Sequence, residues 1–313
     1  MTNPGPAARV VIPNHLMRFA AGLGAPGLSW IQQLPGLVEG CASRWSLTVG
    51  PAFPGPSISF VAPALDANSS AVVLKIGFPD HETAHEAEAL RLLDGDGAVR
   101  LVAADPDHNA LLLERLTPGE PLSAVADEEQ ANVTATGLLR RFWRQIPPDH
   151  PFDLLADRAA KWAEAVVPTF RAVGKPFEVR LVEEAAALFA HLSGRRDETF
   201  LLHQDFHHGN ILSANREPWL IIDPKPLVGE RAFDAGSLLR DRRAELLATS
   251  APARLMARRL DLLAEQLTLD RARMSGWALA QGVELGLWSY QAGDVEEAKA
   301  LIACARLLAG FMP

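Results

Sequence analysis

One stretch of the sequence gathers the side chains that could do chemistry: His203-Gln204-Asp205-Phe206-His207-His208-Gly209-Asn210 is followed by Ile221-Ile222-Asp223. Phosphoryl transfer needs a carboxylate beside the acceptor hydroxyl, oxygen ligands for Mg²⁺ on the nucleotide phosphates, and a cation on those phosphates. Asp205 can accept or orient the hydroxyl proton, and Asn210 and Asp223 can supply oxygens to magnesium. The residue types and their spacing therefore predict phosphoryl transfer from a Mg²⁺–nucleotide complex.

The cation is expected upstream, at Lys75, which lies inside the apolar run AVVLKIG. A strand lysine usually faces solvent, but apolar residues on both sides favour an inward ion pair. Two glutamates in the next helical segment could be its partner. Glu86 shares a helical face with Leu90 and Leu93, whereas Glu88 points elsewhere, so Glu86 is the preferred candidate.

Other interpretations of the same residues stay open. His203, Asp205, His207 and His208 could be the ligands of a zinc hydrolase, although their order does not fit the usual motif. A non-catalytic binding protein is a further alternative. His203 is more typical of a structural histidine that braces the loop. Asp234 is expected to cap a helix or to hold the loop in place, and Lys225 could lie near phosphates or on the surface.

The elements that position these residues can be placed from the hydrophobic pattern. A helix is expected from Leu28 to Trp45, bent or interrupted at Pro35. The runs at 46–50, 57–62, 71–77, 98–105 and 109–116 predict five antiparallel strands, with one helix over 80–93 between the third and the fourth. From about Asp127 onward the sequence is mostly helical in period, except between Thr199 and Val228. The prediction is an α+β chain of two lobes.

We expect an N-terminal lobe over 1–113 with a leading helical extension, a connector over 114–119, and a helical C-terminal lobe over 120–313. Two lobes agree with a length of 313 residues, which exceeds one average domain. Late in the chain, Trp277 and Trp288 share an apolar helix face with Leu285, so both tryptophans are expected in the core.

Composition narrows the classes of function. The formal net charge of −8 argues against a nucleic-acid partner and favours cationic or neutral ligands. Cys41 and Cys304 are far apart and lack a CxxC partner, so a disulfide framework is not expected. Neither a signal peptide nor a membrane span is visible, which predicts a cytoplasmic protein with no membrane partner, present as a monomer or dimer.

The segment from Leu201 to Arg242, LLHQDFHHGNILSANREPWLIIDPKPLVGERAFDAGSLLRDR, resembles the catalytic segment of the aminoglycoside phosphotransferases. Within that superfamily it is most similar to the streptomycin 6-kinase branch, grouped with the hydroxyurea resistance kinases. The resemblance extends more loosely over most of the chain. It implies a protein-kinase-like fold, ATP and Mg²⁺ as cofactors, and a hydroxylated, cationic small-molecule substrate. A kinase of a metabolic alcohol or sugar with the same fold is the alternative.

The same resemblance implies roles for individual residues. Asp205 matches the catalytic aspartate, Asn210 and Asp223 match the magnesium ligands, and Lys75 with Glu86 matches the pair on the nucleotide phosphates. The loop VGPAFPGPSIS lacks GxGxxG, and its Ser57 is a candidate phosphate contact, while adenine is expected against the backbone from Glu114 to Leu116. Two positions depart from the branch: Gln204 and Pro226 stand where glycine is usual.

Overall fold

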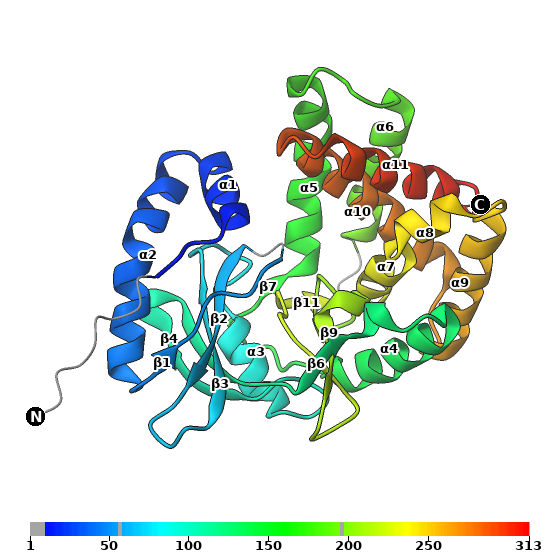
Figure 1. Ribbon diagram of the computed structural model, residues 1–313. Coiled ribbons are helices and arrows are strands. Elements are labelled where there is room, and N and C mark those ends of the chain that lie inside the picture. The colour runs from blue at the N-terminus through cyan, green and yellow to red at the C-terminus, as the bar shows by residue number, and fades with distance from the viewer. Residues whose placement is uncertain (1–9, 56–57, 195–196, 313) are drawn as a thin grey trace, which may run out of the picture. The chain divides into compact units, whose positions relative to one another are not determined.

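The computed structural model describes residues 10–55, 58–194 and 197–312, which form two units (Figure 1). The first unit contains the chain up to Gly95 and Val99–Leu116. The second contains Asp96–Ala98 and the chain from Thr117 onward. The first unit has one sheet and the second has two. Each unit has its own buried residues and contains some of the predicted site residues. No helix within the described ranges has the length and hydropathy to span a bilayer.

The first unit is built on a five-stranded antiparallel sheet in the order β1-β2-β3-β5-β4, which confirms the predicted strands. Two helices, α1 and α2, precede the sheet, and α3 lies between β3 and β4 in sequence. The bounds are α1 Asn14–Gly22, α2 Ala25–Arg44, β1 Thr48–Val49, β2 Ser59–Leu65, β3 Ala71–Gly77, α3 Glu86–Leu93, β4 Leu101–Asp105 and β5 Ala110–Glu114.

Strand alternation divides the side chains of β3 between the two faces of the sheet. Leu74 and Ile76 belong to a core cluster with Trp30, Leu34 and other residues of α2. Because successive strand residues point to opposite faces, Lys75 faces away from that cluster. This alternation positions the one lysine of the strand for contact with the first residue of α3.

The predicted helices of this unit differ from the observed ones at their ends. α2 continues through Pro35 without a break, three residues earlier at its start than expected. The helix expected over 80–93 begins only at Glu86. The Asp80 carboxylate accepts hydrogen bonds from the backbone N–H groups of Glu82 and Thr83. That side-chain turn offers the backbone an alternative to helix, so residues 80–85 remain outside α3.

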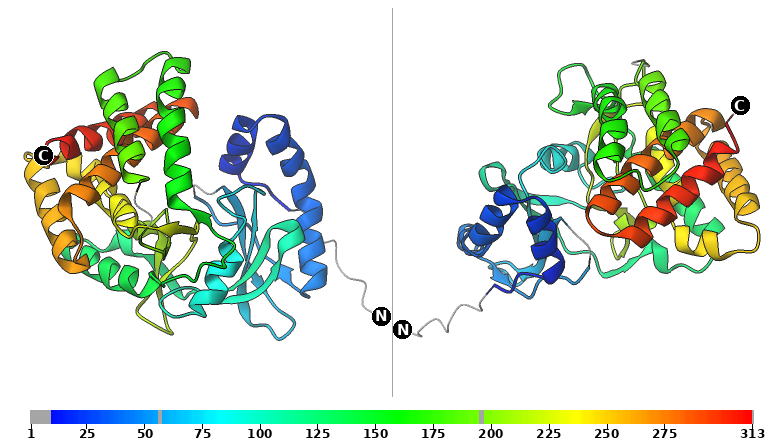
Figure 2. Two further views of the ribbon diagram at one scale, coloured as in Figure 1. Left: turned by 180° about the vertical axis from the view of Figure 1, so that it is seen from behind. Right: turned by 90° about the horizontal axis from the view of Figure 1, so that it is seen from above.

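The second unit is mainly helical, with two small three-stranded sheets ordered β10-β9-β6 and β7-β11-β8. α5 and α6 form a hairpin that packs against α10, and α10 packs in turn against α11 (Figure 2). The helix bounds are α4 Glu128–Phe142, α5 Leu155–Ala172, α6 Val179–Leu192, α7 Ala232–Arg240, α8 Arg243–Ala248, α9 Pro252–Leu267, α10 Arg271–Gln291 and α11 Val295–Ala309. The strand bounds are β6 Pro118–Pro121, β7 Asp153–Leu154, β8 Phe200–Leu202, β9 Ile211–Ala214, β10 Trp219–Ile221 and β11 Leu227–Gly229.

Local sequence explains where these helices begin. Asp127, Asp270 and Asp294 each accept a hydrogen bond from a backbone N–H of the first turn of α4, α10 and α11, so each is an N-cap. In contrast, α7 is buried along its whole length, from Ala232 to Arg240. A helix enclosed on every side can hold polar groups at fixed positions, and its Asp234 contributes to the site described below.

The prediction that both late tryptophans lie in the core is wrong for one of them. Trp277 is 1 % exposed, whereas Trp288 is 53 % exposed and Leu285 is 38 % exposed. α10 is buried almost continuously from Met274 to Val283 but reaches solvent in its last two turns. The apolar stripe in the sequence continues past the point where neighbouring helices cover it, which periodicity alone cannot reveal.

Candidate active site

The short strand β8 leads directly into the loop that carries Asp205. β8 pairs with β11 in an antiparallel register that places Leu202 opposite Leu227. This register brings the chain just before β11 beside the chain just after β8. The backbone N–H of Lys225 accordingly donates to the carbonyl of His203 at 3.0 Å. Two segments separated by about twenty residues in sequence thus meet at one edge of a small sheet.

Asp234, on the buried helix α7, holds the backbone of the loop. Its carboxylate accepts hydrogen bonds from the N–H groups of His203, at 2.9 Å, and Gln204, at 2.8 Å. It also accepts one from the indole of Trp143 at 3.0 Å. Burial raises the pKa of Asp234 to about 6, and these three donors oppose that rise. Of the two roles expected for Asp234, the structure shows the one that ties down the loop.

His203 braces the loop from its other side. Its side chain is fully buried, and Nε2 lies 3.0 Å from the carbonyl oxygen of Ile222. A carbonyl only accepts, so Nε2 carries the proton of the neutral ring. Burial lowers the pKa of His203 to about 4, against the opposing charge of Asp205. The neutral imidazole therefore links the loop to the residue that precedes Asp223.

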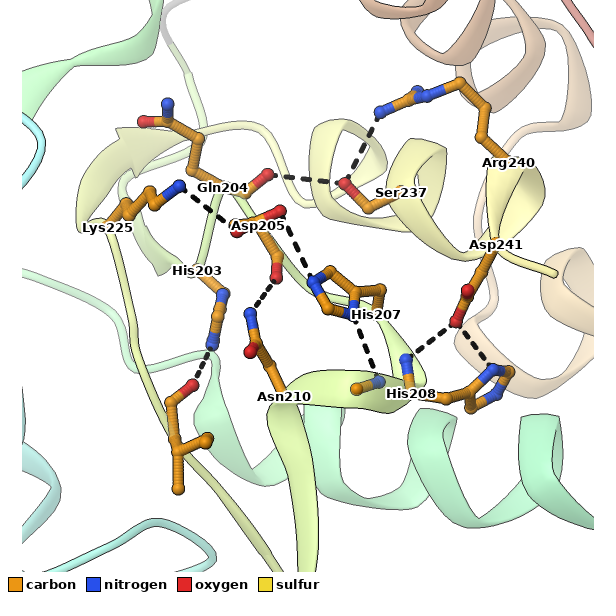
Figure 3. A network of polar contacts seen from close by, with 12 residues as sticks. His203, Gln204, Asp205, His207, His208, Asn210, Lys225, Ser237, Arg240 and Asp241 are labelled. Atoms are coloured by element: carbon orange, nitrogen blue, oxygen red, sulfur yellow. Dashed lines mark hydrogen bonds and ion pairs between the residues drawn. The ribbon is translucent and has the colours of Figure 1, made fainter. Parts of the chain in front are cut away.

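Two side chains flank the Asp205 carboxylate, whose side chain is 37 % exposed (Figure 3). Nζ of Lys225 lies 3.1 Å from one carboxylate oxygen, and Nε2 of His207 lies 3.8 Å from the other. The Nδ1 atom of His207 accepts a hydrogen bond from the N–H of Gly209, which leaves the proton of a neutral ring on Nε2. Burial alone would raise the pKa of Asp205, but the positive charge of Lys225 and the hydrogen bond from its Nζ hold that pKa well below its usual range.

Asn210 is oriented by the same loop. Its Nδ2 donates to the backbone carbonyl of Asp205 at 3.0 Å, which fixes the side-chain amide and leaves Oδ1 as the acceptor end. Asp223 follows the buried residue Ile221 by two positions and adopts a left-handed backbone with a φ of 57°. An amide oxygen and a carboxylate are oxygen donors of the kind that Mg²⁺ accepts while keeping water or phosphate oxygens in its other positions.

The histidines are not arranged as a zinc site. Nδ1 of His208 lies 2.7 Å from the Asp241 carboxylate, and its side chain is 1 % exposed. His203 is bound to a backbone carbonyl, as described above. Among the residues that the structure describes, no group of three or more His, Cys, Asp or Glu side chains could hold a metal ion. One ring nitrogen each of His203, His207 and His208 thus has a partner within the loop and its surroundings.

The first unit contains the other predicted pair. Nζ of Lys75 and the Glu86 carboxylate form an ion pair in which both side chains are buried, at 7 % and 4 % exposure. Glu88 is 37 % exposed and pairs instead with Arg91 and His85. The strand alternation at β3 and the start of α3 at Glu86 therefore select one glutamate of the two candidates.

Glu114, Leu116 and Ser57 are the remaining residues that were predicted to contact the nucleotide. The backbone N–H of Glu114 donates to the carbonyl of Arg100, and its side chain accepts from the N–H of Arg100. Leu116 is 6 % exposed. Their predicted contact with adenine stays a prediction. Ser57, the candidate phosphate contact, lies outside the described residues.

Comparison with known proteins decides the family. The family model described as aminoglycoside/hydroxyurea antibiotic resistance kinase matches residues 44–293. The chain is 37 % identical to the streptomycin 6-kinase of Streptomyces glaucescens, over 96 % of this chain and 98 % of that protein. It is 36 % identical to the hydroxyurea phosphotransferase of Kitasatospora aureofaciens, over 97 % of this chain and 87 % of that protein. The chain belongs to this kinase family.

Solved structures agree on the fold. The kinase resembles the choline kinase LicA from Streptococcus pneumoniae with a TM-score of 0.62 and 13 % identity, over 87 % of this chain and 97 % of that one. It resembles an aminoglycoside phosphotransferase, APH(4)-Ia, in a ternary complex with ADP and hygromycin B, with a TM-score of 0.60 and 14 % identity, over 87 % of this chain and 97 % of that one. These values confirm the protein-kinase-like α+β fold. The zinc hydrolase alternative is therefore set aside, and the kinase is a phosphotransferase that acts on a hydroxyl group.

Two features of the loop were not predicted. The sequence is equally compatible with Lys225 on the surface and with Lys225 in the site. Its position two residues after Asp223 is a signal that favours the site. The sequence shows Gln204 as a departure from the usual glycine but does not show its backbone conformation. Its φ of 68° shows what the usual glycine provides, because only glycine adopts a left-handed backbone without steric cost.

Proposed function

We propose that this kinase transfers the γ-phosphoryl group of ATP to a hydroxyl of an aminoglycoside, with streptomycin as the first candidate acceptor. The observation that carries the proposal is the geometry of the loop after β8. Its carboxylate, Asp205, is held ionised and partly exposed, next to an oriented amide at Asn210. Relatives that match nearly the whole chain at 36–37 % identity include two streptomycin 6-kinases.

Each group has a defined part in this mechanism. Asp205 accepts a hydrogen bond from the acceptor hydroxyl and aligns it for direct in-line attack on the γ-phosphorus. The acceptor oxygen bonds to that phosphorus, the bond to the bridging oxygen breaks, and ADP leaves with the electron pair. The hydroxyl proton passes to Asp205 and from there to water. Because the charges nearby keep its pKa low, Asp205 acts mainly by orientation rather than as a strong base.

The remaining predicted residues bind the nucleotide in this proposal. Asn210 and Asp223 would hold Mg²⁺, which neutralises phosphate charge when bound. Lys75, oriented by Glu86, would contact the phosphates, and the backbone from Glu114 to Leu116 would contact adenine. Ser57 would contact a phosphate. ATP is available in the cytoplasm, where we place the protein.

A cationic acceptor agrees with the charge of the chain. A net charge of −8 attracts polycations and disfavours anionic substrates. Hydroxyurea is a second candidate acceptor, because the chain is 36 % identical to a hydroxyurea phosphotransferase over nearly its whole length. A metabolic amino alcohol or sugar is the third.

A coupled assay of ADP release tests the proposal directly. The panel comprises streptomycin, other aminoglycosides, hydroxyurea, simple amino alcohols and sugars, each with ATP and Mg²⁺. We expect streptomycin to give the highest kcat/KM and mass spectrometry to find one added phosphoryl group. Turnover of an amino alcohol or sugar alone would replace the aminoglycoside assignment, whereas absence of turnover across the panel would contradict it.

The Asp205→Asn variant tests the role of the carboxylate. We expect kcat to fall by roughly 10³-fold or more, with ATP affinity retained within about threefold, because the carboxylate acts on the acceptor. Glu245→Gln, on the exposed side of α8, is the matched control. An equal fall in ATP affinity and kcat for Asp205→Asn would contradict an acceptor-directed role.

A further inference from the structure

Lys225 is placed against Asp205 by the backbone of the loop and not by chance contact of a long side chain. Its N–H is bonded to the carbonyl of His203, two residues before Asp205. Two residues later, β11 begins its pairing with β8. The lysine side chain is only 18 % exposed, and Nζ lies 3.1 Å from Oδ2 of Asp205. Figure 3 shows the two side chains meeting from the two segments that this register joins.

The two carboxylate oxygens of Asp205 have different neighbours. Lys225 is at Oδ2, and His207 is at Oδ1, 3.8 Å away. Of the two, the lysine lies nearer to the carboxylate and carries a full positive charge at neutral pH. A fixed positive charge therefore lies beside the residue that the proposed function places next to the acceptor hydroxyl.

The proposed reaction brings the negative γ-phosphoryl group close to the negative Asp205 carboxylate. The γ-phosphoryl group carries negative charge, and the acceptor hydroxyl must lie between it and the Asp205 carboxylate. Two anions that approach a shared group repel each other, and the repulsion grows as water is excluded. The anion that orients the hydroxyl would thus also weaken binding of the nucleotide unless a nearby cation cancels its charge.

We propose that Lys225 is this cation: a positioning residue that neutralises Asp205, so that the carboxylate can orient the acceptor without repelling the γ-phosphate. The inference rests on the proposed function and adds a part to it that the family match does not assign. It acts through Asp205, so the effect of losing Lys225 should depend on whether Asp205 is charged. A lysine that only stabilises the fold would have the same effect in either case.

A double-mutant cycle on nucleotide binding tests this dependence without requiring turnover. The affinity of AMP-PNP with Mg²⁺ is measured by calorimetry for the wild type, Lys225→Met, Asp205→Asn and the double variant. We expect Lys225→Met to weaken binding by about tenfold and the double variant to bind within about twofold of Asp205→Asn. Equal weakening by Lys225→Met in both backgrounds would overturn the proposal.

Turnover and a conservative variant provide a second test. We expect Lys225→Met to lower kcat by about 10²-fold while the KM of the acceptor changes less than about threefold. Lys225→Arg, which keeps the charge, should recover at least about a tenth of the wild-type kcat. If Lys225→Met lowers the melting temperature so far that it cannot be assayed, Lys225→Arg and Lys225→Gln are compared, and an equal loss in both overturns the proposal.

A matched lysine separates a local effect from a change in net charge. Lys299, on the exposed side of α11, pairs with Glu296 and lies on an element that does not supply the site. Lys299→Met should bind AMP-PNP as the wild type does. Failure of the wild type to bind nucleotide or to phosphorylate any acceptor would contradict the proposed function itself, whereas a functional wild type with no difference between the two lysine variants would contradict only the role of Lys225.

Discussion

Oδ1 of Asp234 lies 2.8 Å from the backbone nitrogen of Gln204, and this contact fixes a residue whose backbone is in the left-handed region. Oδ2 of the same carboxylate binds the N–H of His203 and the indole of Trp143. One buried anion on α7 therefore determines the direction in which the chain leaves β8. That direction in turn determines the position of Asp205, the next residue.

Asp234→Asn should destabilise the kinase and impair catalysis together. The variant presents an amide NH₂ to N–H donors, so at least one buried bond to a charged acceptor is lost, at about 2–3 kcal/mol of unfolding free energy. Urea unfolding followed by circular dichroism measures this. Trp143→Phe removes the indole donor and part of a buried ring but leaves both backbone bonds to Asp234 in place, so it should lower stability as well while kcat stays closer to that of the wild type. Equal kcat values for the two variants would argue against control of the loop backbone by Asp234.

Gln204→Gly should stabilise the kinase. A left-handed backbone costs an L-residue about 1 kcal/mol that glycine does not incur, and the unfolded-state entropy of glycine offsets part of that gain. We expect a melting temperature higher by about 1–3 °C. Gln204→Ala keeps the Cβ atom and should show no such rise, so a rise in both variants would attribute the effect to the glutamine side chain instead.

Glu86→Ala should be far more damaging than Glu88→Ala, two residues later in the same helix. Removal of Glu86 leaves the buried ammonium of Lys75 without its carboxylate, which typically costs about 3–5 kcal/mol. Glu88 is 37 % exposed, and loss of its surface pairs should cost less than about 1 kcal/mol. The comparison uses urea unfolding of both variants. Similar losses would mean that the Lys75–Glu86 pair contributes little to the stability of the first unit.

His203 should make the stability depend on pH. Its pKa is lowered to about 4 in the folded protein, whereas the unfolded chain has the ordinary value of about 6.5. Between these values the unfolded state binds a proton that the folded state does not, so stability falls as pH falls from 7 to 4. The contribution is about 3 kcal/mol at most. Unfolding of wild type and His203→Gln across this range should show a steeper decline for the wild type, and parallel curves would refute the assignment.

The family and the fold could be predicted from the sequence, but several contacts around the candidate site could not. The segment from Leu201 to Arg242 indicated the family because its residue types and spacing are local, and the five strands could be predicted because their runs end in clear turn residues. Lys225 could not be assigned, because its contact with Asp205 depends on the register between β8 and β11, which is a tertiary property. Trp288 was placed in the core because an apolar stripe does not reveal where its neighbours end. α3 starts at Glu86, later than predicted, because the Asp80 carboxylate binds the backbone N–H groups of Glu82 and Thr83.

The Asp234 carboxylate binds backbone N–H groups, which every residue except proline possesses. The loop beside the Asp205 carboxylate can therefore change its side chains over evolutionary time while the carboxylate keeps its place. The glutamine at 204 is an example of such a change, tolerated at a modest conformational cost. Side chains next to Asp205 can therefore vary among related chains without moving its carboxylate.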